Sequence, residues 1–216
     1  MIKLSCLPVS LFEEFIQGKR TFLSWAEQLK SYGLDGLDIS PYMITNTTNH
    51  TQLEQYKDGL DTIGLPVAMY VTYSDFLQHD VPIADELEKL ELQFQKATIF
   101  NADLIRITAG QEYPSLELEW VLDRLKQAFP KIEAMANKYK IKAVLENHGK
   151  PNSWKYRDFT ADEHHLEALL PLLNTIGINF DTANPIIQGY DLFSMFKRLS
   201  DRIVSIHAAD TATLGS

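Results

Sequence analysis

Residues 141–146 and 176–181 read Ile141-Lys-Ala-Val-Leu-Glu146 and Ile176-Gly-Ile-Asn-Phe-Asp181. Each segment is a short, mostly apolar run rich in β-forming residues, and each ends on a carboxylate. Apolar runs of this length are typical of strands that are buried on both faces of a parallel sheet. These two segments therefore indicate an α/β fold built on parallel strands.

Seven runs of this kind alternate along the chain with longer stretches that have helical spacing. Such alternation, without a break in composition, predicts an α/β fold with right-handed crossovers. We expect one domain that covers residues 1–216. The predicted strands are Ile2–Cys6, Leu34–Ile39, Pro66–Thr72, Ala102–Thr108, Ile141–Glu146, Ile176–Asp181 and Ile203–His207.

A doubly wound sheet and a closed barrel both fit this alternation. No Gly-x-Gly-x-x-Gly motif follows the first predicted strand, so a dinucleotide-binding sheet loses its main support. A TIM-type (β/α) barrel is therefore favoured. A barrel needs eight units and seven are visible, so we expect that the last βα unit is missing or that the sheet is closed in another way.

Composition limits the classes of partner. The 216 residues carry a formal net charge of −9 without a cluster of Lys and Arg, which argues against a nucleic-acid partner. Cys6 is the one cysteine, so an intrachain disulfide is impossible, which suits a reducing compartment. Because no apolar run approaches the roughly 20 residues of a membrane span, we expect a cytoplasmic protein without a membrane partner.

Three late predicted strands end in residues that bind metals, namely Glu146, Asp181 and His207. Parallel strands place their C-terminal ends on one face, so these side chains should converge. Carboxylate and imidazole ligands suit one divalent ion, Mn²⁺, Mg²⁺, Co²⁺ or Zn²⁺. The competing interpretation of each residue alone is structural, since an Asp after a strand often caps the next helix.

The motifs Leu-Glu146-Asn-His, Asn-Phe-Asp181-Thr-Ala-Asn and Ser-Ile-His207-Ala-Ala-Asp resemble the sugar phosphate isomerase/epimerase family of xylose-isomerase-like barrels. That family includes ketose 3-epimerases, hydroxypyruvate isomerase and inosose dehydratase. The resemblance implies that Glu146, Asp181 and His207 bind the metal. It also implies a fourth ligand, a glutamate on an eighth strand, which this sequence does not contain.

The activity implied by the resemblance is metal-dependent isomerisation or epimerisation of a small sugar or sugar derivative. Glu146 would act as ligand and as acid/base, removing a proton beside a carbonyl to give an enediolate. One alternative is a dehydratase of a cyclic polyol, which would use the same metal and base. Another class is a non-catalytic or truncated barrel that only binds a ligand.

Weaker candidates surround these ligands. His148 follows on the same side of its strand end and is a candidate for contact with a substrate hydroxyl, as is Asn184 through its amide. Arg106 lies within a predicted strand, where it would orient a buried carboxylate or meet an anionic substrate. Trp154 lies in a long loop, where stacking on a sugar ring and simple packing of the loop are equally open. Asp210 would orient the histidine ligand, with a plain loop position as the alternative.

Overall fold

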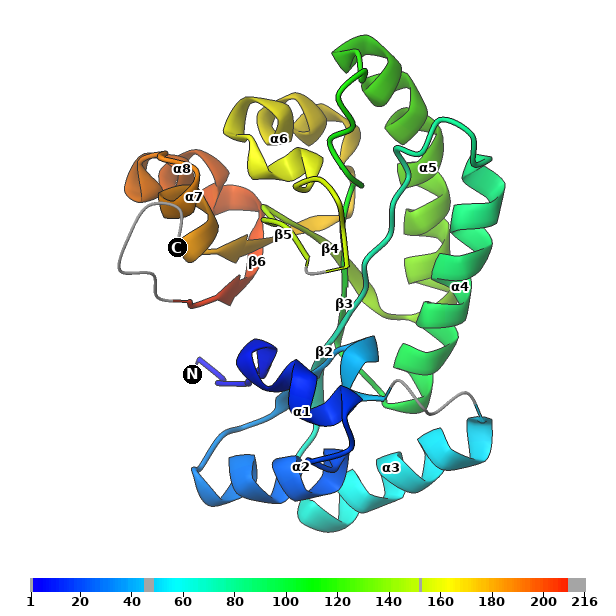
Figure 1. Cartoon of the computed structure of the whole chain (residues 1–216), viewed down its shortest axis with the longest axis vertical. Coiled ribbons are helices and arrows are strands. Elements are labelled where there is room, and N and C mark those ends of the chain that lie inside the picture. The colour runs from blue at the N-terminus through cyan, green and yellow to red at the C-terminus, as the bar shows by residue number, and fades with distance from the viewer. Residues whose placement is uncertain (1, 45–48, 152, 210–216) are drawn as a thin grey trace. The chain divides into compact units, whose positions relative to one another are not determined.

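The computed structural model of the chain describes residues 2–44, 49–151 and 153–209 (Figure 1). The chain divides into two compact units, one made of Met1–Thr72 with Leu92–Ile105 and the other of Tyr73–Glu91 with Arg106–Ser216. Six strands are neighbours in chain order, β1-β2-β3-β4-β5-β6, and this confirms the α/β fold class. That residues 1–216 form one domain stays a prediction.

In the first unit, β1 (Leu37–Ile39) pairs in parallel with β2 (Val67–Val71). The helices α2 (Phe22–Ser31) and α3 (His50–Ile63) lie side by side (Figure 1). They approach closely because Gly59 has no side chain, since a Cβ there would lie 2.6 Å from Leu23 Cδ2. The unit also contains η1 (Val9–Leu11), α1 (Phe12–Ile16), η2 (Pro41–Met43) and the second half of α4 (Ile83–Ile99).

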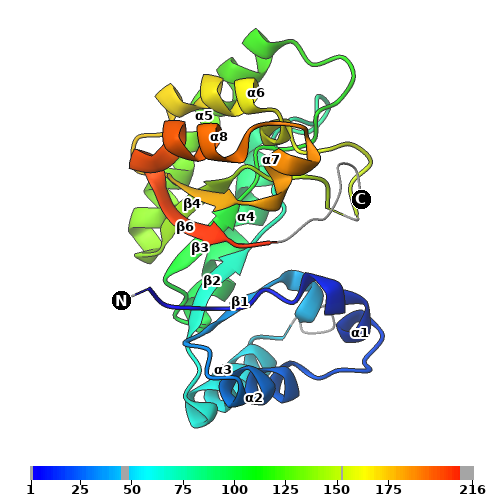
Figure 2. The ribbon, with the colours of Figure 1, turned by 90° about the vertical axis from the view of Figure 1, so that its left-hand side faces the viewer.

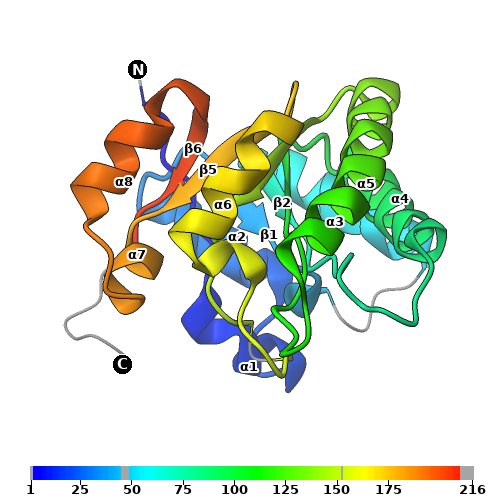
Figure 3. The same cartoon turned by 90° about the horizontal axis from the view of Figure 1, so that it is seen from above.

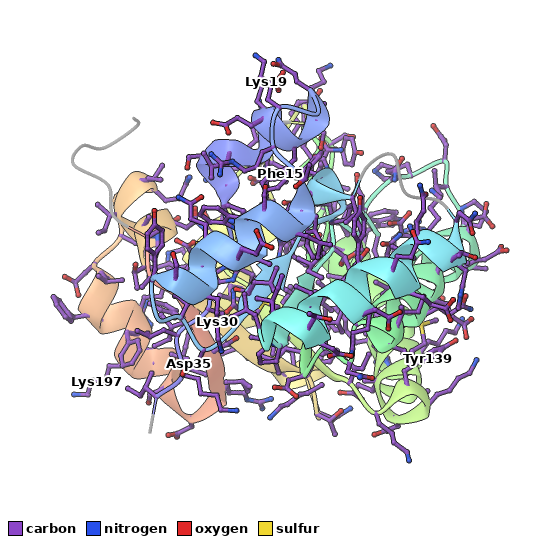
Figure 4. All side chains as sticks on the ribbon, turned by 90° about the horizontal axis from the view of Figure 1, so that it is seen from below. Phe15, Lys19, Lys30, Asp35, Tyr139 and Lys197 are labelled. Atoms are coloured by element: carbon purple, nitrogen blue, oxygen red, sulfur yellow. The ribbon has the colours of Figure 1, made fainter. Side chains whose placement is uncertain are left out.

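A lysine joins the ends of these two helices. Lys30, near the end of α2 and labelled in Figure 4, donates from Nζ to the Gly64 carbonyl oxygen at 2.8 Å. Gly64 closes α3 in the left-handed conformation, with a φ of 71°. A cation at the C-terminal end of a helix compensates carbonyl groups that lack an intrahelical partner.

The prediction of a strand over Ile2–Cys6 is wrong. The segment still accepts backbone hydrogen bonds, from Asp35 and Gly36 to the Leu4 carbonyl and from Asp38 to the Cys6 carbonyl. The Leu4 N–H, however, donates to the Asp35 carboxylate at 2.9 Å and not to a backbone carbonyl. The segment thus pairs through its carbonyl groups, and this is insufficient for a regular strand.

The second unit carries the parallel strands β4 (Lys142–Glu146), β5 (Gly177–Asp181) and β6 (Ile203–His207). The strand β3 (Leu104–Ile107) ends in this unit. Figure 2 shows α7 (Ala183–Ile187) and α8 (Leu192–Leu199) beside β5 and β6, and Figure 3 shows α6 (Glu163–Leu169) beside α5 (Leu118–Tyr139). The short helices are η3 (Phe159–Ala161), η4 (Leu170–Leu172) and η5 (Ser200–Arg202).

The helix α5 is continuous although Pro130 lies inside it. Sequence spacing predicts that this proline kinks or divides the helix; in the structure it does not divide it. A buried stripe of Val121, Leu125, Phe129 and Ile132 holds the helix in place, and this packing offsets the hydrogen bond that a proline cannot donate. Among the residues that the structure describes, no helix is both long enough and apolar enough to cross a membrane.

Candidate functional site

The ends of β4, β5 and β6 bring Glu146, Asp181 and His207 together within the second unit. The parallel register pairs Asp181 with His207 and Glu146 with Asn179. One ligand atom from each of the three residues lies within 4.8 Å of the other two. The convergence expected from the sequence is therefore present, and the role of the three side chains as metal ligands stays a prediction.

Glu146 is the most confined member of this group, with 2% of its surface exposed. Its Oε1 atom lies 2.7 Å from His207 Nδ1 and accepts a hydrogen bond from Asn179 Nδ2 at 3.1 Å. Its Oε2 atom forms an ion pair with Arg106 Nε at 3.0 Å. Burial would raise the pKa of Glu146, but the charges of Arg106 and His207 outweigh it and hold the pKa well below its usual range. The carboxyl group is therefore ionised.

The pKa of Asp181 is shifted in the opposite direction from that of Glu146. Burial raises the pKa of Asp181 to about 6, and the charge of Glu146 acts in the same direction. The N–H groups of Ala183 and Asn184 donate to its Oδ1 atom at 2.8 and 2.9 Å and oppose this shift. Two carboxylates that repel one another in a half-buried place are stabilised by a cation between them.

The three ligand atoms fit a divalent ion in kind and in spacing. Oxygen and nitrogen ligands lie about 2.0–2.6 Å from such an ion, so two ligands of one ion are at most about 5 Å apart. The ligand atoms of Glu146, Asp181 and His207 lie within 4.8 Å of one another and meet this limit.

Arg106, a candidate from the sequence, lies 1% exposed beside this group. It forms an ion pair with the buried Glu146 carboxylate, and its contact with an anionic substrate stays a prediction. The guanidinium Cζ lies 4.8 Å from the centre of the Tyr73 ring. The Tyr73 ring in turn packs edge-on against the His148 ring, with 6.1 Å between the two ring centres. Sequence reasoning missed Tyr73, because an aromatic residue that follows a strand carries no specific signal.

His148 is a neutral imidazole in this environment. Burial, together with the nearby charge of Arg106, lowers the pKa of His148 to about 3. Its Nδ1 atom is buried and has no hydrogen-bond partner among the residues that the structure describes. A neutral histidine with an unused polar atom is suited to a hydrogen bond with a ligand hydroxyl.

The remaining candidates lie at different places. Asn184 lies against Gly149, where a Cβ atom would come 2.6 Å from the Asn184 amide oxygen. Trp154 is 9% exposed, so its ring is packed into the protein. Its stacking on a sugar stays a prediction. Asp210 lies outside the described residues.

Three polar residues that the sequence reasoning did not select fix the geometry of the site. Asn147 bridges two strands, because it accepts from the Asp181 N–H at 2.7 Å and donates to the Asp181 carbonyl at 2.9 Å. Asn179 holds Glu146, and Ser205 Oγ in turn donates to Asn179 Oδ1 at 2.7 Å. A usable signal existed for Asn179, since it stands two residues before Asp181 and so shares its face of the strand.

The loop after β4 is held by the loop after β3. Gln111 Oε1 accepts hydrogen bonds from the backbone N–H groups of Lys155 and Tyr156 at 2.9 and 3.0 Å. Its Nε2 atom donates to Asp75 Oδ2 at 2.9 Å, so both ends of the amide are engaged. Arg157 adds an ion pair with Glu112. The segment that contains Trp154 is thus anchored by fixed partners.

Comparison with known proteins supports the fold. The family model described as "Xylose isomerase-like TIM barrel" matches residues 26–215. No curated protein matches the sequence at a significant level.

Solved structures give the same result at low sequence identity. The probable 3-DHS dehydratase AsbF from Bacillus anthracis is 20% identical with a TM-score of 0.74, and the match covers 95% of this chain and 72% of that one. The 3-keto-D-glucoside 4-epimerase YcjR from E. coli is 17% identical with a TM-score of 0.71, covering 96% and 78%. A sugar phosphate isomerase/epimerase from Parabacteroides distasonis is 16% identical with a TM-score of 0.66, covering 96% and 75%. These likenesses concern the fold.

Proposed function

Because the chain belongs to the family of xylose isomerase-like TIM barrels, we propose that it is a divalent-metal-dependent isomerase or epimerase of a small sugar or sugar derivative. One observation carries the proposal: Glu146, Asp181 and His207 present two carboxylates and an imidazole within 4.8 Å of one another. Structural neighbours named as a sugar epimerase and a sugar phosphate isomerase/epimerase support the substrate class.

The three side chains would hold the ion, which when bound supplies a Lewis acid that polarises the carbonyl group of the substrate. Glu146 is the proposed base. Arg106 keeps its carboxylate ionised, so it is ready to accept a proton from the carbon next to the carbonyl. The product of this transfer is an enediolate, and returning the proton to another atom or face gives the isomer or epimer.

A carboxylate of low pKa is a weak base, so the transfer requires an acidified C–H bond and good positioning. Arg106 and Asn179 fix the orientation of Glu146, because each contacts a different oxygen of its carboxylate. His148, neutral and with a buried unpaired Nδ1 atom, would hydrogen-bond a substrate hydroxyl. These residues bind and orient the substrate without changing their own charge.

A second candidate is a dehydratase of a cyclic polyol. It would begin with the same proton abstraction by Glu146 and would end with loss of a hydroxyl group as water. The similarity to a probable dehydratase, with a TM-score of 0.74, is the observation that favours this reaction. Analysis of the product by mass distinguishes the two candidates, because dehydration removes one water and isomerisation leaves the mass unchanged.

We also infer that the protein works on a free small molecule in the cytoplasm. A net charge of −9 does not favour a polyanionic partner, and the single cysteine suits a reducing compartment. Localisation of a tagged chain in cells tests this inference, and a signal outside the cytoplasm would contradict it.

The first experiment measures metal binding. Metal-free protein is titrated with Mn²⁺ in a calorimeter, beside the variants Asp181→Asn and His207→Ala. We expect binding to the wild type at a stoichiometry of one and a large loss in both variants. Asp162→Asn is the matched control, because Asp162 is a helix-capping aspartate outside the group. Absence of binding to the wild type, or equal binding to the Asp181 variant, would refute the metal site.

The second experiment measures proton exchange. The Mn²⁺-loaded protein is incubated with a panel of ketoses and cyclic keto-polyols in deuterated water, and NMR follows the loss of C–H signals. We expect exchange on at least one compound and its loss in Glu146→Gln. Exchange that persists in Glu146→Gln would contradict the assignment of the base, even where the metal site is intact.

A further inference from the structure

A buried aspartate outside the proposed ligand group has a hydrogen-bond arrangement that an ionised carboxylate does not explain. Asp158 has no exposed surface, and its Oδ1 atom accepts from the Thr160 N–H at 2.8 Å at the start of η3. Its Oδ2 atom is buried and, in the described part of the chain, has no hydrogen-bond partner. A charged carboxylate oxygen that is buried without a hydrogen-bond partner carries a large desolvation cost.

The contacts of Thr160 indicate where the proton lies. Thr160 Oγ1 lies 2.7 Å from the Glu146 carbonyl oxygen and also 2.7 Å from Asp158 Oδ1. Two oxygens at this distance need a proton between them. The threonine hydroxyl supplies one proton and the backbone carbonyl supplies none. The second proton must therefore come from the Asp158 carboxyl group.

This assignment also satisfies the hydroxyl group completely. With the proton on Asp158, Thr160 Oγ1 would donate to the Glu146 carbonyl, accept from the His148 N–H at 3.2 Å and accept the Asp158 proton across the 2.7 Å contact. One donated and two accepted hydrogen bonds are the full capacity of a hydroxyl group. The hydroxyl group thus links the backbone on both sides of Asn147 to the buried acid.

We infer that Asp158 keeps its proton at neutral pH and is a positioning residue that, through Thr160, fixes the end of β4 where Glu146 and His148 stand. The importance of this positioning for catalysis rests on the proposed function, whereas the protonation does not. The charges that face Asp158 are those of Arg106 on β3 and Glu146 on β4, and they act in opposite directions. Burial raises the pKa of Asp158 well above its ordinary value.

The first test is the pH dependence of stability in the variant Asp158→Asn. A group whose pKa is raised by folding destabilises the folded protein as pH rises from the unfolded pKa, about 3.9, towards the folded pKa. Asparagine is uncharged and does not follow this trend. The urea midpoint of the metal-free variant, minus that of the wild type, is therefore expected to rise from about pH 4 towards neutral pH.

Asp162→Asn is the control with the opposite sign. Asp162 caps α6 through its carboxylate, and although burial acts to raise its pKa, its hydrogen bonds lower it. The urea midpoint of Asp162→Asn minus that of the wild type should therefore stay nearly constant from about pH 4 to neutral pH, and should rise only as pH falls below about 4. A midpoint difference for Asp158→Asn that falls, or that does not change with pH, would overturn the inference.

A spectroscopic measurement detects the proton directly. The infrared difference between the wild type and Asp158→Asn at neutral pH should contain the carbonyl band of a protonated carboxyl group, which shifts in deuterated water. The absence of this band, with the symmetric and antisymmetric bands of a carboxylate in its place, would also overturn the inference.

The positioning role is tested at Thr160 without metal or substrate. Thr160→Val removes the hydroxyl group, while Thr160→Ser retains it as the conservative variant. The hydrogen exchange of the His148 amide, measured by NMR, should accelerate at least tenfold in Thr160→Val and stay within about twofold in Thr160→Ser. Equal exchange in both variants would refute the positioning role.

A parallel Mn²⁺ titration separates this inference from the proposed function. If Glu146 is a ligand, Thr160→Val should weaken Mn²⁺ binding by about tenfold or more, and Thr160→Ser should preserve it. A wild type that does not bind Mn²⁺ contradicts the proposed function alone, because the midpoint, infrared and exchange measurements still decide the state and role of Asp158.

Discussion

Arg106→Met removes the buried cation that faces Glu146 while retaining most of the volume of the side chain. The guanidinium and the carboxylate are 1% and 2% exposed, and Nε lies 3.0 Å from Oε2. After the substitution, Oε1 keeps its contacts with His207 and Asn179, whereas Oε2 loses its charged partner. The carboxylate is then buried with one of its two oxygens lacking a charged partner.

The distance between the Arg106 guanidinium and the Glu146 carboxylate sets the size of the expected loss of unfolding free energy. Unit charges 3.0 Å apart interact by about 5 kcal/mol at an effective dielectric constant of about 20. Breaking a buried pair by removing one partner typically costs about 3–5 kcal/mol. Since the contacts of Oε1 remain, we expect Arg106→Met to lose about 3 kcal/mol of unfolding free energy at pH 7.5 without metal.

The loss should depend on pH with a definite sign. In the wild type the pKa of Glu146 is lowered, so its contribution to stability is present above the unfolded pKa of about 4.3 and is lost as pH falls through the folded pKa. In Arg106→Met the folded pKa is higher and the carboxyl group protonates more readily. The free-energy difference between the two proteins should therefore shrink when pH is lowered towards about 4.

Urea unfolding in the presence of a chelator, at pH 7.5 and near pH 4.5, measures both quantities. The double variant Arg106→Met/Glu146→Gln should recover at least half of the loss, because it removes the unpaired charge. Arg198→Met is the control, since Arg198 is 40% exposed where it pairs with Glu163 and Glu167 and should cost less than about 1 kcal/mol. A loss below about 1 kcal/mol for Arg106→Met, or one that grows at low pH, would refute the reasoning.

Three further changes test other parts of the site. Burial raises the pKa of Asp181 to about 6 in the folded protein, from about 3.9 in the unfolded chain. Metal-free Asp181→Asn should therefore become more stable than the wild type as pH rises through this interval, by up to about 3 kcal/mol in urea unfolding. Saturating Mn²⁺ should make the wild type the more stable protein. Gln111→Met removes the acceptor of two backbone N–H groups, so the Lys155 and Tyr156 amides should exchange faster by NMR and thermal unfolding should show a loss of about 1–3 kcal/mol. Gly149→Ala places a Cβ 2.6 Å from the Asn184 amide oxygen. Because that oxygen ends a flexible side chain, the substitution should cost less than about 1 kcal/mol in urea unfolding. Gly149→Ala/Asn184→Ala should recover this cost, and a loss well above about 1 kcal/mol that Asn184→Ala does not recover would contradict the contact.

The sequence was sufficient to place the strands because apolar runs buried on both faces have a local signature. Six of the seven predicted runs contain the six strands found among the described residues. The remaining run, Ile2–Cys6, has the composition of a strand, but its Leu4 N–H donates to the Asp35 side chain. Composition does not reveal such a competition, because it depends on a partner more than thirty residues away.

The convergence of Glu146, Asp181 and His207 followed from topology, since parallel strands must end on one side. The partners that set the electrostatics of these residues were harder to find. Arg106 was recognised as a buried charge in need of a partner, and in the structure it forms an ion pair with Glu146. Tyr73 and Thr160 were not selected, because nothing in a single sequence relates a residue in one loop to the backbone of another strand.

The loop after β4 is attached through its main chain. The N–H groups of Lys155, Tyr156 and Phe159 and the carbonyl of Arg157 make the anchoring contacts with residues 110–112. The Lys155 side chain is exposed, so replacing it leaves these main-chain contacts in place. A library that randomises the exposed Lys155 and leaves Gln111 and the packed Trp154 ring intact should therefore keep the loop backbone in place, which makes this position tolerant of engineered side chains.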